Sequence, residues 1–575
     1  MASRFLDEDR NSPPRSAEGT EQAAAEWATG ELALAVLAAP GPPQLAILGH
    51  LEQKDKLNLG ATCTSLQQAS LVWFPEVTAE VVLVKTDVAS LAAWLERHQA
   101  CLHLSDVLHD DDDDGTEHGP LEVEWNDSLM ALPASLIVSL TTGYQLCSHV
   151  STLTALTGLE LEGWSWKDCL YGSISPRHLQ PLTRLKQLGV RDGDIGSIAE
   201  ELLSLPALTG LQDLYMSNCS LQTMPRALSA HTQLTALDLF VNDFSTTEPI
   251  ATLQRLQRLD LSYCSLTAVP AQLSALTALT SLNLAEVERL DRGWQHLAPL
   301  IQLQDLDLRS CSLTAVPAQL SALTALTCLD LGNNDLLGRG WQHLLPLIRL
   351  CHLVLYRCHL TALPQQLSVL TALTSLDLTS ALRARINAWQ HLLPLIQLRE
   401  LFLKDSRLKT IPEQVATLTA LTCLCLADNN KLHGGCQHLL PLTRLQDLDL
   451  SGCKLKAVPA ELSALAALTR LNLYASKRLA GGWQNLLCLT LLQDLDLSGI
   501  KLKAVPAELS ALTTLTNLDL SRNRELAGGW QHLLPLTQLR QLDLRNARLP
   551  GREVPAELAA MPRLSMDYYG LCCFD

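Results

Sequence analysis

The segment LQRLDLSYCSLTAVPAQLSALTALTSLNL, residues 256–284, recurs almost unchanged as LQDLDLRSCSLTAVPAQLSALTALTCLDL at residues 303–331. The first leucine of this segment then returns at steps of 47 or 48 residues, at Leu350, Leu398, Leu445, Leu492 and Leu539. Each step contains two half-repeats of about 23 and 24 residues. One unit copied in tandem therefore makes up most of the chain.

Every half-repeat carries the pattern Leu-x-x-Leu-x-Leu-x-x-(Asn or Cys)-x-Leu, which resembles the leucine-rich repeat family. The resemblance implies a short strand at Leu-x-Leu, with Leu259 and Leu261 pointing inward and residue 260 toward solvent. One such unit cannot bury its apolar face alone, so neighbouring units must stack. We expect an α/β fold: a curved solenoid with a parallel sheet on its concave side and helical or irregular segments on its convex side.

Seventeen strands are expected from the repeated leucines. Their central leucines are Leu159, Leu188, Leu214, Leu237, Leu259, Leu282, Leu306, Leu329, Leu353, Leu376, Leu401, Leu424, Leu448, Leu471, Leu495, Leu518 and Leu542. With strands about 4.8 Å apart, the concave sheet extends for roughly 80 Å.

The two half-repeats differ on the convex side. One has a Val-Pro or Leu-Pro step before a short helical run, as at Pro270, where proline is tolerated in the first turn. The other contains Gly-Trp-Gln-His-Leu, and its tryptophans are expected to pack between neighbouring turns: Trp294, Trp341, Trp389, Trp483 and Trp530. Cys436 replaces the tryptophan of one copy. The histidines of this motif recur because the unit was copied, so they do not indicate a catalytic or metal site.

Five of the 17 cysteines occupy the Asn/Cys position of the repeat, where a small buried side chain ends each strand: Cys219, Cys264, Cys311, Cys358 and Cys453. They lie about two strand spacings apart, near 10 Å, which exceeds the Cα separation of a disulfide. We expect free thiols, no metal site and a reducing compartment, cytoplasmic or nuclear.

Composition excludes several function classes. The 575 residues are 47% hydrophobic but only 4% aromatic, and the formal net charge is −17. An acidic chain without a basic stripe does not favour nucleic acid or an anionic membrane as partner. The opening residues 1–22 are polar, unlike a signal peptide. The sequence contains no phosphate-binding loop, nucleophile elbow or His-Glu-x-x-His motif, so we predict neither an enzyme nor a cofactor.

A segment before the repeats, residues 39–77, places apolar and polar residues at helical spacing: Pro40, Ile47, Leu48, Leu51, Asp55, Leu57, Cys63 and Leu66, followed by Trp73 and Phe74. This arrangement resembles an F-box. The resemblance implies that these residues bind the Skp adaptor of a cullin-RING ubiquitin ligase, while the repeats present the substrate.

Two readings of that segment stay open. In one, the chain is an F-box/leucine-rich-repeat substrate receptor. In the other, the helices are only a cap, which solenoids require, and the chain is a free-standing cytoplasmic scaffold or adaptor, with a cytoskeletal or ciliary location as an alternative. Both readings predict protein partners and a monomeric chain.

The predicted domain organisation follows from these patterns. Residues 1–30 form a disordered tail, 31–80 an F-box-like helical domain, 81–150 degenerate first repeats with an acidic loop at 110–120, 151–560 the solenoid, and 561–575 a C-terminal cap.

The position between the two strand leucines faces the concave side. It holds aspartate in nine half-repeats, at Asp238, Asp260, Asp307, Asp330, Asp377, Asp449, Asp496, Asp519 and Asp543. Leu-Asp-Leu is common in such repeats, so the aspartates alone indicate no ligand. Val354, Phe402 and Cys425 interrupt the row.

Polar and aromatic residues adjoin this interruption, namely His352, Tyr356, Arg357, Lys404 and Asp405. Aromatic and arginine side chains amid polar neighbours are typical of binding hot spots. We therefore predict that these five residues, together with the three that interrupt the row, form the main partner site.

Overall fold

The computed structural model describes residues 76–80, 86–98, 100–106, 119–143, 148–162, 176–244, 246–287, 290–382, 388–547, 558 and 565–567. They belong to two compact units. The first comprises Met1–Gly189 with Leu205–Leu208, and the second Val190–Ser204 with Thr209–Asp575. The F-box-like residues from Pro40 to Leu66 and the acidic run at 110–114 lie outside the described residues.

The described residues of the first unit form parallel strands and two full α-helices. Its elements are β1 (Glu76–Glu80), α5 (Val88–His98), β2 (Cys101–Asp106), α6 (Gly119–Met130), β3 (Ile137–Thr142), η4 (Ser148–Thr152), β4 (Gly158–Glu162) and η5 (Pro176–Leu179). Strands β1 to β4 pair in parallel in chain order. Leu95 of α5 and Trp125 of α6 are fully buried with Leu102, Ile137 and Leu140 of the strands.

Strand β5 (Gln187–Arg191) lies at the boundary between the units, and β6 to β21 belong to the second unit. Those strands are β6 (Asp213–Tyr215), β7 (Ala236–Asp238), β8 (Arg258–Asp260), β9 (Ser281–Asn283), β10 (Asp305–Asp307), β11 (Cys328–Asp330), β12 (His352–Val354), β13 (Ser375–Asp377), β14 (Glu400–Phe402), β15 (Cys423–Cys425), β16 (Asp447–Asp449), β17 (Arg470–Asn472), β18 (Asp494–Asp496), β19 (Asn517–Asp519), β20 (Gln541–Asp543) and β21 (Ser565–Asp567).

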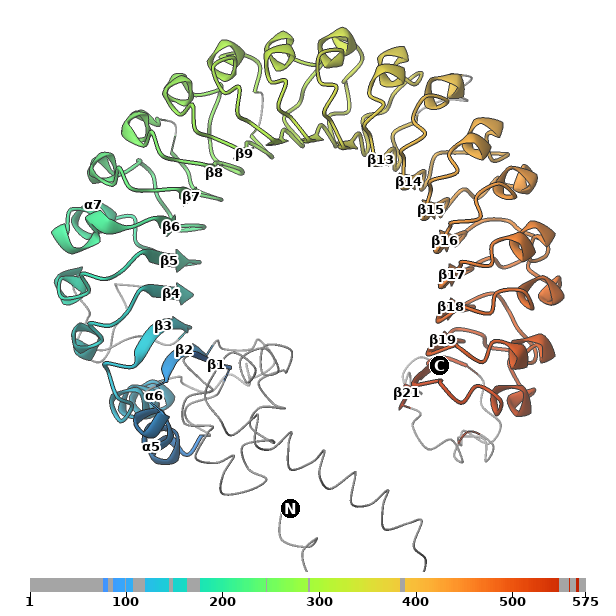
Figure 1. Cartoon of the computed structure of the whole chain (residues 1–575), viewed down its shortest axis with the longest axis horizontal. Helices are drawn as coiled ribbons and strands as arrows, with labels where there is room; N and C mark the ends of the chain where they lie inside the picture. The colour runs from blue at the N-terminus through green and yellow to red at the C-terminus, as the bar shows by residue number, and fades with distance from the viewer. Residues whose placement is uncertain are drawn as a thin grey trace, which may run out of the picture. The chain divides into compact units, whose positions relative to one another are not determined.

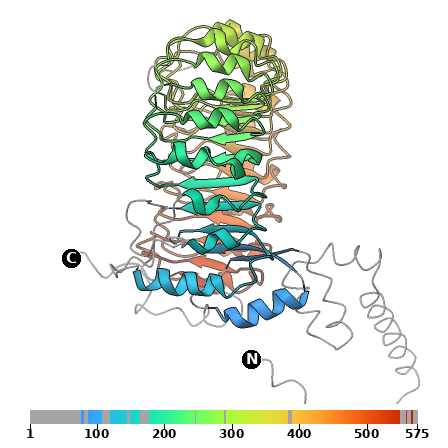
Figure 2. The ribbon, with the colours of Figure 1, turned by 90° about the vertical axis from the view of Figure 1, so that its left-hand side faces the viewer.

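Within the second unit the strands lie side by side on the inner, concave side, and the connecting turns lie outside them (Figure 1). Seen from the side, successive strands form stacked parallel layers (Figure 2). Each strand pairs in register with the next, so that Leu306, Leu329 and Leu353 stand opposite one another. This is the predicted leucine-rich repeat solenoid, and all seventeen predicted central leucines lie in strands.

The outer segments are short and helical, as expected. Apart from α7 (Ala199–Leu203), the described ones are single turns of 3-10 helix. They are η6 (Pro206–Gly210), η7 (Arg226–Ala230), η8 (Glu248–Thr252), η9 (Ala271–Ala275), η10 (Trp294–Leu297), η11 (Ala318–Ala322), η12 (Trp341–Leu344), η13 (Gln365–Val369), η14 (Trp389–Leu392), η15 (Glu413–Thr417), η16 (Cys436–Leu439), η17 (Ala460–Ala464), η18 (Trp483–Leu486), η19 (Ala507–Ala511) and η20 (Trp530–Leu533). Each of these outer turns spans only four or five residues, a length at which 3-10 helix is common.

Leucine fills the core of every described repeat. In the copy at 303–331, Leu303, Leu306, Leu308, Leu320 and Leu329 are all fully buried. Complete burial of one such side chain contributes about 1.5–3 kcal/mol, so the stacked leucines are the main source of stability.

The Asn/Cys position satisfies backbone groups that leave the sheet. In Asn429, the side-chain amide donates to the carbonyls of Leu403 and Leu426, both at 2.8 Å, and its oxygen accepts the Leu408 N–H at 2.9 Å. Cys453 in the next half-repeat donates its S–H to the Leu426 carbonyl at 3.3 Å. The prediction of a small buried residue at this position is confirmed.

Glycine before the Trp-Gln-His motif has a geometric reason. Gly340 has φ +84°, and a Cβ atom there would lie 2.5 Å from the carbonyl oxygen of Val316 in the preceding half-repeat. Only glycine therefore permits both the left-handed turn and the close approach of the two backbones.

We predict that Asn429→Ala destabilises the second unit by about 3 kcal/mol, because it leaves the buried Leu408 N–H and Leu403 carbonyl without their side-chain partner. The exposed neighbour Asn430 provides a matched control, and Asn430→Ala should cost less than about 0.5 kcal/mol. Hydrogen exchange at the Leu408 amide measures the effect locally. Equal exchange rates in the two variants would contradict the structural role of Asn429.

Candidate functional site

The residues between the strand leucines form one continuous row across the concave sheet of the second unit. Strand register aligns Asp330, Val354, Asp377, Phe402 and Cys425 in that order. The row continues through Asp449, Asn472, Asp496, Asp519 and Asp543. We call this set, from Asp238 to Asp543, the concave row.

Most members of the concave row support the turn that follows their own strand. In each of the nine aspartates and in Asn283 and Asn472, a side-chain oxygen accepts the backbone N–H two residues later, at 2.7–3.0 Å. Asp330 accepts from Gly332 at 2.7 Å, and Asn472 accepts from Tyr474 at 2.9 Å. The aspartates are therefore explained by the backbone, without a ligand.

Val354 and Phe402 have no oxygen with which to accept the N–H of Tyr356 or Lys404, and Cys425 offers only a thiol. All three side chains are half-buried on the sheet surface. Phe402 and Cys425 lie on adjacent strands, while Asp377 of β13 separates Val354 from Phe402. At these three positions the row therefore offers no side-chain oxygen to the following turn, and the partly exposed atoms are carbon or sulfur.

Polar residues of the predicted site lie in and after strands β12 and β14. His352 is exposed within β12, and the Arg357 guanidinium stacks on the Tyr356 ring at 5.1 Å from its centroid. Lys404 forms an ion pair with Asp428 at 3.4 Å, and the Asp405 carboxylate accepts the Ser380 hydroxyl at 3.3 Å.

A hollow of about 360 Å³ opens beside this group. Its lining includes Arg357 and Asp405 together with His359, Ser380 and Arg407. Of the eight predicted concave residues, Arg357 and Asp405 line this hollow, and Val354, Phe402 and Cys425 lie on β12, β14 and β15. Whether they bind a partner remains a prediction, and the predicted adaptor residues from Pro40 to Leu66 lie outside the described residues.

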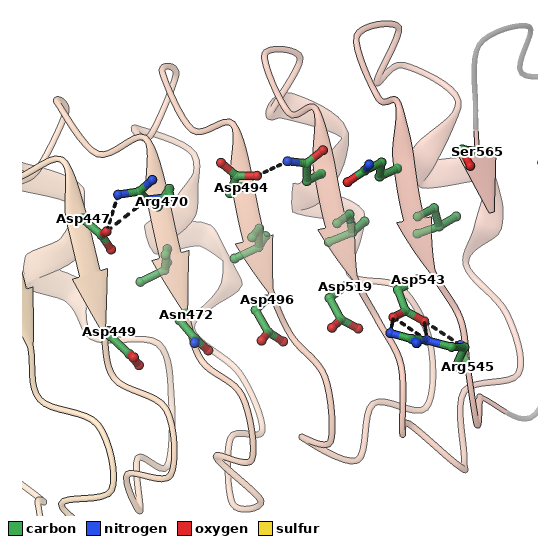
Figure 3. Close-up of a pocket in the computed structure, with 16 residues that line it drawn as sticks. Asp447, Asp449, Arg470, Asn472, Asp494, Asp496, Asp519, Asp543, Arg545 and Ser565 are labelled. Carbon is green, nitrogen blue, oxygen red and sulfur yellow. Dashed lines mark hydrogen bonds and ion pairs between the residues drawn. The ribbon is translucent and has the colours of Figure 1, made fainter. Parts of the chain in front are cut away.

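A second surface was missed by the sequence analysis. A groove of about 530 Å³ crosses β16 to β21 on the concave side and is lined by six aspartates and two arginines (Figure 3). Arg470 pairs with Asp447 at 2.7 Å, and Arg545 pairs with Asp543 at 2.5 Å. Asp449, Asp496 and Asp519 also line the groove, and Figure 3 shows them in one line with Asp543 across the strands. We call this surface the acidic groove.

Burial, helped by neighbouring carboxylates, raises the pKa of several members of the row. The pKa of Asp330 rises from 3.8 to about 6, mainly because the group is buried and to a smaller extent because of the charges of Asp307 and Asp377, while the Gly332 N–H bond lowers it. Burial likewise raises the pKa of Asp238, Asp307 and Asp496. A cation brought to this surface would relieve the repulsion.

Three half-buried thiols of the concave strands are poor nucleophiles. Burial raises the pKa of Cys328 and Cys423 to about 12 and that of Cys425 to about 11. Nucleophilic catalysis needs a lowered thiol pKa, so these residues favour no covalent chemistry. The described cysteines are free, and the described part of the chain contains no group of three or more side chains placed to hold a metal ion. Among its helices, none has the length and apolar character needed to cross a membrane.

We predict that Asp330→Asn stabilises the chain above pH 6 by about 1 kcal/mol and has little effect at pH 4. The folded-state pKa of about 6 lies above the ordinary value of 3.8. The stabilisation from proton binding is therefore complete below 3.8 and is lost as the pH rises through 6. Asparagine does not ionise, and it keeps the turn bond as Asn283 and Asn472 do. Denaturant unfolding at both pH values measures the difference, and an equal difference at the two would contradict the assignment.

No protein-family model matches the chain, and no curated protein matches it. Among solved structures, it is similar to a leucine-rich repeat protein of Leptospira interrogans, with 23% identity, TM-score 0.45, and coverage of 76% of this chain and 96% of that one. It is also similar to the ectodomain of the Arabidopsis thaliana receptor kinase GASSHO1/SCHENGEN3, solved with Casparian strip integrity factor 2, with 24% identity, TM-score 0.43, and coverage of 76% and 56%. A third similar structure is the plant peptide hormone receptor RGFR1 in complex with RGF2, with 19% identity, TM-score 0.42, and coverage of 81% of this chain and 82% of that one.

Proposed function

We propose that the chain is a non-enzymatic protein-interaction protein that holds a segment of a partner on the concave face of its second unit. The observation that carries this proposal is the interruption of the concave row. Val354, Phe402 and Cys425 stand where eleven other members use an oxygen to support the following turn. Replacing a stabilising acceptor with a partly exposed aromatic ring is typical of a binding surface.

The order of residues along the concave row suggests the chemistry of the partner. A segment lying across the strands meets Phe402 and Cys425 first, and then Asp449 and Asp496 of the acidic groove. Phe402 and Asp496 are four strands apart, roughly 19 Å at about 4.8 Å per strand. About six residues of extended chain span that distance. We therefore propose a partner segment with an apolar anchor followed by basic residues.

Charge favours the same partner. The formal net charge of the chain is −17, and the acidic groove concentrates carboxylates that repel one another. Lysine or arginine side chains of a partner neutralise them, and the long-range field of the chain speeds the encounter. Like-charged, acidic partners are disfavoured on this surface.

We predict that Phe402→Ala with Arg357→Ala weakens partner capture by more than about 2 kcal/mol and leaves the melting temperature almost unchanged. The reason is that both side chains are partly or fully exposed and neither supports a turn. Proximity labelling followed by quantitative mass spectrometry measures capture in cells.

The matched control is Asp496→Asn with Asp519→Asn. These changes keep the acceptor for the following turn and leave the Phe402 anchor intact, so they should reduce capture less. An identical partner list for the wild type and the Phe402/Arg357 variant would place the binding site elsewhere.

We propose further that residues 39–77 attach the chain to a Skp adaptor, which makes it the substrate-recognition subunit of a cullin-RING ubiquitin ligase. The support is the F-box-like spacing of Pro40, Ile47, Leu48, Leu51 and Asp55. A cytoplasmic or nuclear location is part of this proposal and accords with the free thiols of the described residues.

If the segment binds the adaptor, Leu48→Ala with Leu51→Ala should abolish co-purification of a Skp adaptor, because both leucines belong to its predicted apolar helix face. The melting transition of the repeats should be unchanged, which serves as the control. Failure of the unmutated chain to bind the adaptor would favour the free-standing scaffold and leave the concave-face proposal intact.

A further inference from the structure

One copy of the repeated tryptophan motif lacks its indole ring. Five of the six copies place tryptophan directly after the motif's first residue, and Cys436 occupies that position in the fourth. A hollow of about 380 Å³ opens at Cys436, between the turn that leads into η16 and the segment after β16. None of the concave row residues lines it.

The next copy of the unit has a tryptophan at the position of Cys436. Trp483 lies 47 residues after Cys436, and both follow a left-handed glycine, with φ +85° at Gly435 and +82° at Gly482. Both begin a 3-10 turn, η16 and η18. The two side chains therefore leave equivalent backbones in the same direction, and the Trp483 side chain is half-buried there.

The lining is almost identical in the two copies. The segment KLKAVPAE occurs at 454–461 beside Cys436 and again at 501–508, at the equivalent place beside Trp483. Of the residues that line the hollow, only His433 and Cys436 differ in the second copy, where Ala480 and Trp483 stand. The same surroundings thus accommodate an indole in one copy and are open in the other.

The chemistry of the lining suits an aromatic ring with an acidic neighbour. Leu455 and Pro459 are buried and form an apolar wall. Burial and the charge of Glu461 raise the pKa of the Cys436 thiol to about 11, so it is neutral and behaves as a small apolar group. Lys454 and Lys456 are exposed at the rim, and among the described residues neither pairs with a carboxylate.

We propose that the hollow at Cys436 binds a tryptophan side chain of a partner protein that carries a carboxylate next to it. The indole occupies the volume that Trp483 fills in the following copy. The carboxylate pairs with Lys454 or Lys456, and the ammonium groups also attract the face of the ring. This site is separate from the concave face and does not depend on the function proposed for it.

The test uses the full chain and N-acetyl-5-fluoro-tryptophan, observed by fluorine NMR. A single indole with one ion pair should bind with a Kd on the order of 1 mM. Cys436→Trp fills the hollow with the chain's own indole, so binding should weaken at least tenfold while the melting temperature does not fall. Cys436→Ser, which leaves the hollow open, is the matched control and should keep the affinity of the wild type within a factor of about three.

Two further variants separate the parts of the proposal. Trp483→Cys recreates the hollow with the same KLKAVPAE lining and should double the number of bound probe molecules. Lys454→Ala with Lys456→Ala should weaken binding of the probe several-fold and leave binding of its neutral amide unchanged. The proposal is overturned if the wild type leaves the probe signal unchanged up to about 10 mM, or if Cys436→Trp binds as well as the wild type.

Discussion

Every turn that leaves a strand of the second unit must find partners for its backbone groups inside a stack that excludes water. Two sets of side chains meet this requirement. Asparagine at the Asn/Cys position, as in Asn429, bonds backbone groups of its own and the preceding half-repeat. An aspartate or asparagine of the concave row accepts one N–H of its own turn. Unpaired buried backbone groups are costly, so the leucine core alone would not hold these turns.

This constraint divides the positions of the concave row into two kinds: those whose side chain stabilises a turn, and those whose side chain is free to contact a partner. Where the row holds aspartate, the carboxylate is already engaged by Ser498 or Gly332, for example, and its presence says nothing about a ligand. Phe402 has no oxygen to accept the Lys404 N–H, so its turn lacks the hydrogen bond that aspartate makes elsewhere in the row. Natural chains lose stability mainly at sites that serve another purpose, and this is the physical reason for assigning partner binding to the interruption.

Leucine spacing was enough to predict the strands, their register and the buried core. Leucines such as Leu306 and Leu329 can be buried only if neighbouring strands pair with these residues opposite one another. It placed β2 and β3 only within a stretch of degenerate first repeats at 81–150, because α5 and α6, of 11 and 12 residues, interrupt the short period there. It did not predict β1, which lies at 76–80, within the segment expected to be a helical F-box-like domain. Strand β21 was missed as well, because its Ser565–Asp567 segment contains no Leu-x-Leu pair.

The candidate sites were predicted less completely than the fold. Phe402 and Val354 could be recognised in the sequence because they replace an aspartate that recurs at this position. The acidic groove could not, because its residues come from six strands and are brought together only by the pairing register of those strands. The role of Asp330 in supporting its turn could have been predicted from the sequence. Two other half-repeats have asparagine at this position, Asn283 and Asn472, and asparagine keeps the acceptor oxygen. The hollow at Cys436 was visible as a missing tryptophan, but its opening depends on how the 454–461 segment packs.

Our central claim is that the concave row supports turns where it is polar and binds a partner where it is interrupted. The most direct test is to measure melting temperature and partner capture in parallel for Phe402→Asn, which gives the Lys404 N–H an acceptor and adds no charge. Asn472 already plays this role between Asp449 and Asp496. We predict an equal or higher melting temperature together with loss of capture. A variant that melts earlier and still captures its partner would contradict the account.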